Sequence, residues 1–180
     1  MVKQGRAILS ILALVFTVPT FAQKATLMLP MVKAEVSQVI AVSVTVTTDS
    51  LLTFAQFVVE YNANVLRFDH AENGGDAVGF ALLVQPNLPF SPTALGTNAN
   101  VLAQISSAAQ NIFGSKRVAV NFYFKAIGAA GDSSVLVFDA ATNHTVLSTR
   151  SGKDIFGSDL TFVNGVVRVT GLTILLGWHR

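Results

Sequence analysis

Hydrophobic and polar residues alternate along much of the chain with a period of two, which is the repeat of a strand with one buried face. The alternation is clearest over residues 39–48, 54–61 and 118–124. In the first of these ranges, every second residue from 42 to 46 is valine, and serine or threonine follows each. β-Branched and aromatic residues in this arrangement suit a half-buried strand, so each range is predicted to form one.

Short turn sequences separate these segments. Asn164-Gly165 between two apolar runs is typical of a β-hairpin, and glycine-rich turns lie at 73–76 and 128–132. Only residues 97–109 and 140–143 have a weakly helical pattern. Many short strands with regular turns predict an all-β protein, an antiparallel sandwich or jelly roll. The other candidate strands are shorter or less regular and cover residues 25–29, 65–68, 78–84, 101–106, 135–138, 144–147 and 160–169.

The first residues have the order of a signal peptide. Lys3 and Arg6 precede an apolar run at 7–18, and small residues end at Ala22. A cationic start, an apolar segment and a small-residue cleavage site are typical of secretion. The run is short of the ~20 residues that an uncleaved membrane anchor needs. We therefore predict that residues 1–22 are removed and that the mature chain is exported without a membrane span.

These patterns divide the chain into three parts. After the signal peptide, residues 23–170 are predicted to form one β-sandwich domain. Residues 171–180 form a short apolar tail, which is too short to span a membrane and looks truncated.

Composition excludes several function classes. Removal of residues 1–22 takes away two of the 12 basic residues and none of the 10 acidic ones, so the exported chain is neutral. Because a nucleic-acid-binding domain carries a basic patch, nucleic acid is not predicted as a partner. The chain has no cysteine, which excludes disulfides, thiol catalysis and thiolate metal sites.

The predicted strand at 54–61 has two apolar residues on its outward side, where a face exposed to water is usually polar. Apolar residues with glutamine and glutamate at their edge are typical of an interface core with a polar rim. A covering loop or scattered surface apolar residues would give the same pattern. Because Val58 is predicted to point outward, Val58→Asp is expected to abolish partner binding and to leave the fold intact. The predicted partner-binding residues are Phe54, Gln56, Val58 and Glu60, with Gln104 and Ser106 on a neighbouring strand.

The order of these elements resembles that of a cohesin domain, the module that captures dockerins in cellulosomes and related bacterial surface systems. Asn62-Ala63 and Ser37-Gln38 differ from the Asp-Pro and Gly-Asp that the family usually has at these turns. The resemblance is carried by paired opening strands at 25–30 and 39–46, a strand and turn at 57–68, a Phe-rich strand, glycine turn and apolar strand within 117–137, and a closing Gly-Val-Val-x-Val strand within 162–169.

The resemblance implies a nine-stranded β-sandwich of jelly-roll topology, an extracellular setting and no catalysis. It also implies a dockerin partner, which brings its own calcium and binds one sheet face that includes the strand at 54–61. We therefore predict a secreted, non-catalytic module that docks a dockerin-bearing protein in extracellular polysaccharide degradation or surface assembly. The alternatives are a carbohydrate-binding module of similar sandwich fold and a structural or adhesion domain.

A polysaccharide partner is weakly supported by the aromatic residues. Sugar-binding modules usually present an aromatic platform, but the chain has one Trp, which lies in the tail, and two Tyr. Tyr61 is expected to point inward and Tyr123 outward. A groove that binds a single glycan chain through Asn and Gln stays open as an alternative.

No catalytic residues, metal site or cofactor are predicted. The three histidines are scattered, and neither His-Glu-x-x-His nor Gly-x-Ser-x-Gly is present. Asp69, Glu72 and Asp76 surround a glycine loop and offer oxygen ligands that calcium prefers. Their spacing is not that of an EF-hand loop, so we expect a solvated turn there.

Overall fold

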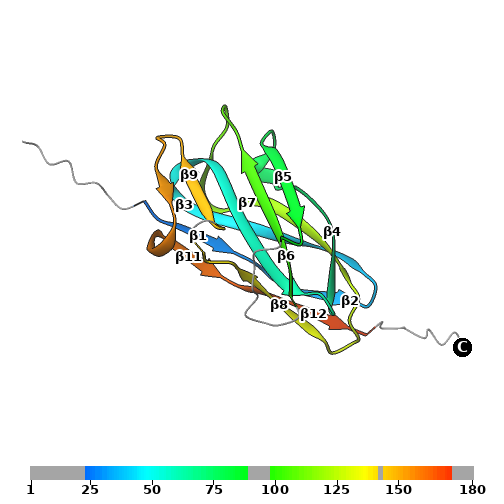
Figure 1. Cartoon of the computed structure of the whole chain (residues 1–180). Coiled ribbons are helices and arrows are strands. Elements are labelled where there is room, and N and C mark those ends of the chain that lie inside the picture. The colour runs from blue at the N-terminus through cyan, green and yellow to red at the C-terminus, as the bar shows by residue number, and fades with distance from the viewer. Residues whose placement is uncertain (1–22, 89–97, 142–143, 172–180) are drawn as a thin grey trace, which may run out of the picture.

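The computed structural model describes residues 23–88, 98–141 and 144–171 (Figure 1). The predicted signal peptide and nearly all of the predicted apolar tail lie outside these residues. The described residues form strands and two single-turn 3-10 helices, η1 (Gly75–Ala77) and η2 (Gly157–Asp159), so the all-β prediction is confirmed. The strands are β1 (Ala25–Met28), β2 (Met31–Glu35), β3 (Val39–Asn62), β4 (Leu66–Asn73), β5 (Ala81–Pro86), β6 (Asn98–Ser106), β7 (Ile112–Ala126), β8 (Ser133–Phe138), β9 (Val146–Thr149), β10 (Asp154–Ile155), β11 (Leu160–Val163) and β12 (Gly165–Thr170).

Strand β3 belongs to both layers of the sandwich. Its first half pairs with β7 and β1, and its second half pairs with β6, β9 and, near its end, β8. The direction changes between Thr48 and Leu52, where the pairing with β7 shifts register. At this bend the Ser50 N–H donates to the Thr48 hydroxyl oxygen at 3.0 Å, which satisfies two buried polar groups.

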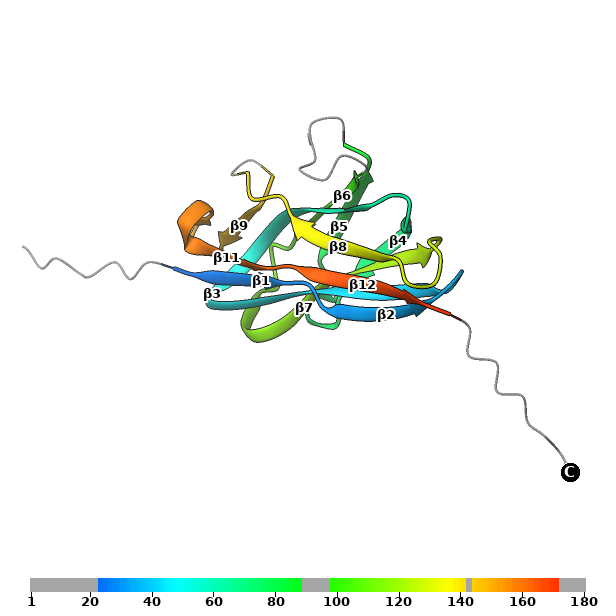
Figure 2. The same cartoon turned by 90° about the horizontal axis from the view of Figure 1, so that it is seen from below.

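Two layers therefore meet at β3, and Figure 2 shows β5, β6 and β8 lying over β1, β2 and β7. One layer has the order β4-β7-β3-β1-β11, and the other has the order β5-β6-β3-β9-β10. Strand β8 pairs with both β3 and β12, and β12 pairs with β2. Among the described residues, no helix has the length and apolar character needed to cross a membrane.

The expected count of nine antiparallel strands is wrong in detail, because the described residues form twelve strands with two parallel pairs, β1 with β11 and β12 with β2. Two predicted strands, 39–48 and 54–61, are the two halves of the bent β3. The predicted strand at 160–169 is divided at Asn164 into β11 and β12, beside the interruption at Pro30 between β1 and β2. Gly165 fits there because a Cβ at this position would lie 2.4 Å from the Pro30 carbonyl oxygen.

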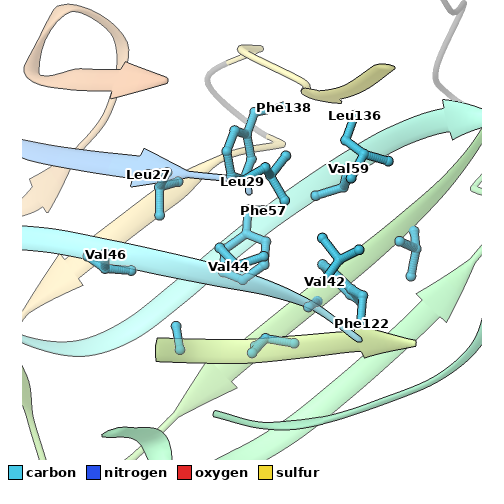
Figure 3. Packing of buried hydrophobic residues seen from close by; sticks show 14 of the residues in the cluster. Leu27, Leu29, Val42, Val44, Val46, Phe57, Val59, Phe122, Leu136 and Phe138 are labelled. Carbon is cyan, nitrogen blue, oxygen red and sulfur yellow. The ribbon is translucent and has the colours of Figure 1, made fainter. Parts of the chain in front are cut away.

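The core between the layers is built on aromatic edge-to-face contacts. Phe57 of β3 has its ring centroid 6.2 Å from those of Phe122 (β7) and Phe138 (β8), at nearly perpendicular angles. In Figure 3 these three rings lie among valines and leucines from both layers. Phe57 and Phe122 have no exposed surface and Phe138 has 3%. These contacts connect the second half of β3 to the opposite layer.

The turn after β3 confirms a structural role for its asparagines. The Asn64 N–H donates to Asn62 Oδ1 at 2.9 Å, and the Val65 N–H donates to the Asn62 carbonyl oxygen at 3.0 Å. Asparagine favours such turns because its side chain bonds the backbone two residues on. Tyr61 points inward, as expected, with its ring centroid 4.9 Å from that of Phe124.

Removal of the Phe57 ring is expected to destabilise the fold. Phe57→Ala leaves a cavity between Phe122 and Phe138 and should lower the free energy of unfolding by about 3–5 kcal/mol in a urea titration. Phe113→Ala is the matched control, because the Phe113 side chain is 51% exposed, and it should change stability by about 0.5 kcal/mol or less. Equal losses in the two variants would contradict this account of the core.

Candidate functional site

All six predicted partner-binding residues lie on one outer face of the sandwich. Strand β6 runs antiparallel to the second half of β3, and directly paired residues in such strands share a face. Phe57, Val59 and Tyr61 point to the opposite side, into the core, so the predicted alternation of residues 54–61 is correct. The cross-strand pairs on the outer face are Phe54 with Ser106, Gln56 with Gln104, Val58 with Leu102, and Glu60 with Asn100.

One half of this face is covered. Val58 has no exposed surface and forms a small cluster with Leu102 and Leu88, apart from the main core. Leu88 follows β5 and lies across the outer side of β3 and β6. Glu60, on the same half, is only 7% exposed. The expectation that Val58 is accessible is therefore wrong, and Val58→Asp is now expected to destabilise the fold.

Asn100 of β6 holds the covering segment in place. Its side-chain Oδ1 accepts from the Leu88 N–H at 2.7 Å, and its Nδ2 donates to the Leu88 carbonyl oxygen at 3.2 Å. The Asn87 N–H donates to the Asn100 backbone carbonyl oxygen at 2.8 Å. One buried amide side chain thus satisfies both backbone groups of Leu88, as a neighbouring strand would do.

The other half of the face is open and almost uncharged. Four outward residues of this half are half-buried: Phe54, Gln56, Gln104 and Ser106. They lie between β5 and β9, two strands that the sequence did not connect with the site. Each outward residue has a further partner on those strands. These partners are Leu83 and Ala81 of β5, opposite Gln104 and Ser106, and Val146 and Ser148 of β9, opposite Gln56 and Phe54.

Leu83 is the most exposed large apolar residue of this open half. Its side chain is 56% exposed beside Gln104. At the opposite edge, the Ser148 hydroxyl donates to an oxygen of Asp154. The open half therefore has an apolar element at one edge, a carboxylate at the other and amides between them. The alternation of β5 and β9 would have shown which of their residues point outward, but the sequence does not show that these strands flank β3 and β6.

The histidines lie on separate parts of the molecule. His144 is next to the covered half, where its Nδ1 lies 2.6 Å from Asp139 Oδ2 and the Asp139 N–H donates to the Val58 carbonyl oxygen. His70 lies on the other layer, and His179 is outside the described residues.

The three acidic residues considered for calcium do not converge. Asp76 accepts from the Val118 N–H at 2.8 Å and forms an ion pair with Arg117 at 3.2 Å. Asp69 and Glu72 lie beside His70 instead. Within the part of the chain that the structure describes, no group of three or more His, Cys, Asp or Glu side chains is placed to hold a metal ion.

The architecture is similar to that of several solved structures. No protein-family model and no curated protein match the chain. Among solved structures, the seventh ScaB type I cohesin from Pseudobacteroides cellulosolvens matches with a TM-score of 0.62 and 16% identity, covering 87% of this chain and 99% of that one. A non-cellulosomal cohesin from the archaeon Archaeoglobus fulgidus matches with a TM-score of 0.61 and 15% identity, covering 82% and 91%.

The chain has a cohesin-like fold. A third match is the sixth cohesin from scaffoldin B of Acetivibrio cellulolyticus, solved in complex with a Cel5 dockerin, with a TM-score of 0.60 and 16% identity, covering 81% of this chain and 99% of that one. At these identities the likeness establishes the fold. The resemblance stated from the sequence is thereby confirmed at the level of the cohesin-like sandwich.

Burial of Val58 in this cohesin-like sandwich reverses the expected effect of a charge there. Val58→Asp should lower the free energy of unfolding by about 3 kcal/mol or more, because a carboxylate under Leu88 has no compensating partner. Leu83→Asp is the matched control and should change it by about 0.5 kcal/mol or less, since the residue is exposed. Chemical denaturation followed by circular dichroism measures both, and a stable Val58→Asp variant would show that the cover at Leu88 is not formed.

Proposed function

We propose that this protein is a non-catalytic docking module that holds a dockerin-type partner on the open half of the β5-β6-β3-β9 face. The observation that carries the proposal is the strip formed by Leu83, Gln104, Gln56 and Phe54. This strip joins an exposed apolar side chain to amides and a half-buried aromatic ring on rigid paired strands. The cohesin-like fold supports a dockerin, because related structures, such as the scaffoldin B cohesin, were solved in complex with one.

The physical design suits recognition of another protein surface. Apolar side chains lose water on binding, while polar groups beside them set the register through hydrogen bonds. Phe54 and Leu83 are apolar anchors, and the Gln56–Gln104 pair offers amide donors and acceptors between them. The cluster of Val58, Leu102 and Leu88 is not a contact surface in this proposal, and it stiffens the strands below the contact.

The predicted site is accordingly revised. Phe54, Gln56, Gln104 and Ser106 stay as proposed contact residues, and Leu83 joins them. Val58 and Glu60 become supporting residues, because both are buried beside the covering segment.

We also propose that the protein acts outside the cell. The order of charges, apolar residues and small residues in 1–22 supports export. The proposed setting is polysaccharide degradation or surface assembly. One neighbour in the comparison is described as a non-cellulosomal cohesin, so the second setting is kept beside the first.

Capture of a dockerin-bearing protein tests the proposal. The exported chain is immobilised and exposed to secreted proteins from the source organism, and retained proteins are identified by mass spectrometry. A dockerin-bearing protein should be retained with calcium and released by a chelator, because a dockerin carries its own calcium. Retention of no dockerin-bearing protein would overturn the proposal.

Variants of the open half then locate the contact. The purified partner is titrated against wild-type protein and against Leu83→Asp and Gln56→Ala by calorimetry. Leu83→Asp should weaken binding by about 100-fold, since charging an exposed apolar anchor of an interface costs on the order of 2–3 kcal/mol. Lys33→Ala, on the distant strand β2, should leave the affinity unchanged, and equal affinities for Leu83→Asp and wild type would exclude this face as the site.

A further inference from the structure

The outer face of the other layer carries a second arrangement of side chains, on β4, β7 and the first half of β3. The pairing of β4 with β7 shifts between Phe68 and His70, so that Asp69 and His70 together oppose Tyr123. Such a β-bulge changes which side chains point outward beyond it. Phe68 packs against the core, and after the bulge His70 and Glu72 lie on the outer face. Without the bulge these two side chains would point inward.

The bulge brings His70 flat against Tyr123. The ring centroids are 4.2 Å apart and the planes differ by 6°. The Tyr123 hydroxyl donates to Glu72 Oε2 at 3.1 Å, and His70 Nδ1 lies 2.8 Å from Asp69 Oδ2. The hydrogen bond to Glu72 raises the pKa of the Tyr123 phenol above 10.0, with smaller contributions from burial and the carboxylate charge. Each ring is therefore held in position by its own carboxylate.

One face of the Tyr123 ring is left open by this stack. His70 covers the side toward β4. Across β3, the residue directly opposite Tyr123 is Ala41, which is exposed and has only a methyl side chain. Among the described residues, no other aromatic ring or cation contacts Tyr123. The ring thus stands beside the exposed surface at Ala41, and we call this part of the outer face the niche.

Polar groups border this niche at the next cross-strand pair. Ser43 pairs with Asn121, and the Ser43 hydroxyl donates to Asn121 Oδ1 at 2.7 Å. This bond uses the Ser43 hydroxyl hydrogen and one lone pair of Asn121 Oδ1, so the Asn121 amide N–H groups and a lone pair of the Ser43 oxygen remain for further hydrogen bonds. Successive outward pairs on a strand are about 6.6 Å apart, so the Ser43–Asn121 pair lies directly beside the Ala41–Tyr123 pair. Val39 and Lys125 form the pair on the other side of the niche.

We propose that the niche of Tyr123, Ala41, Ser43 and Asn121 binds a neutral pyranose unit of a glycan. The C–H groups of a pyranose face carry partial positive charge and are attracted to the negative face of an aromatic ring. The amide and hydroxyl at the border match sugar hydroxyls as donor and acceptor. Two carboxylates, Asp69 and Glu72, and two cations, Arg67 and Lys125, lie on the same outer face, so the balance of charge favours a neutral sugar. This site lies on the layer opposite the docking face and does not depend on the proposed dockerin partner.

The site is tested with soluble oligosaccharides and the exported chain labelled with ¹⁵N. Cellohexaose, xylohexaose and mannohexaose are titrated separately to about 10 mM, which exceeds a weak Kd of about 1 mM. At least one should shift the amide resonances of Ala41, Ser43, Asn121 and Tyr123 in a saturable manner. If none does, or if the saturable shifts lie elsewhere, the proposal is wrong.

Two variants distinguish specific sugar binding at the niche from non-specific binding to the protein surface. Ala41→Leu fills the niche while Tyr123 is kept, and Tyr123→Ala removes the ring, so each should weaken binding at least about 10-fold, equivalent to ~1.4 kcal/mol. Tyr123→Phe keeps the ring and should bind within about 3-fold of wild type. Unchanged binding by a folded Ala41→Leu would overturn the proposal. Leu83→Asp should bind sugar normally, so failure of the dockerin proposal and failure of this one are distinguishable.

Discussion

The passage of β3 from one layer to the other is the constraint on which the rest of the structure depends. A single run of alternating residues has to present apolar side chains to the same core before and after its bend. Val42, Val44 and Val46 do so before it, and Phe57 and Val59 do so after it, all without exposed surface. Because alternation is strict, the residues between them point outward on two opposite faces. The docking face and the niche therefore use the two halves of one strand.

The two halves of the docking face differ because only one of them is crossed by another chain segment. The backbone polar groups of that segment are hydrogen-bonded by Asn100. A segment that crosses a sheet surface buries N–H and C=O groups, and these are costly unless they are hydrogen-bonded. Asn100 supplies both bonds to Leu88, so the segment lies flat and excludes water from Val58 and Leu102. On the open half, no described segment of the chain lies over the side chains of the strands. An apolar pair thus becomes a stiff support at one end of the face, and an accessible surface is left at the other.

The sequence predicted the parity of residues 54–61 correctly, because alternation depends only on neighbours along the strand. It could not predict that Val58 is covered, since the cover is Leu88 and its anchor is Asn100, both distant in sequence. The weakly helical pattern at 97–109 was also overridden, because β6 pairs with β3 on one edge and β5 on the other. The bulge at Asp69 is a further case, because simple alternation through β4 would have pointed His70 inward.

The position of the niche depends on the register shift between β4 and β7 at Asp69. The bulge interrupts the hydrogen-bond ladder between β4 and β7, so the side chains it turns outward supply other contacts in its place. Here His70 and Tyr123 stack, and Asp69 and Glu72 fix the two rings. These contacts use only one face of Tyr123, and the strand on its other side presents Ala41, the smallest side chain in its outward row. A larger residue at 41 would cover the tyrosine and shield more apolar surface. The fixed Tyr123 ring and the small residue beside it are the two features on which the proposed sugar site depends.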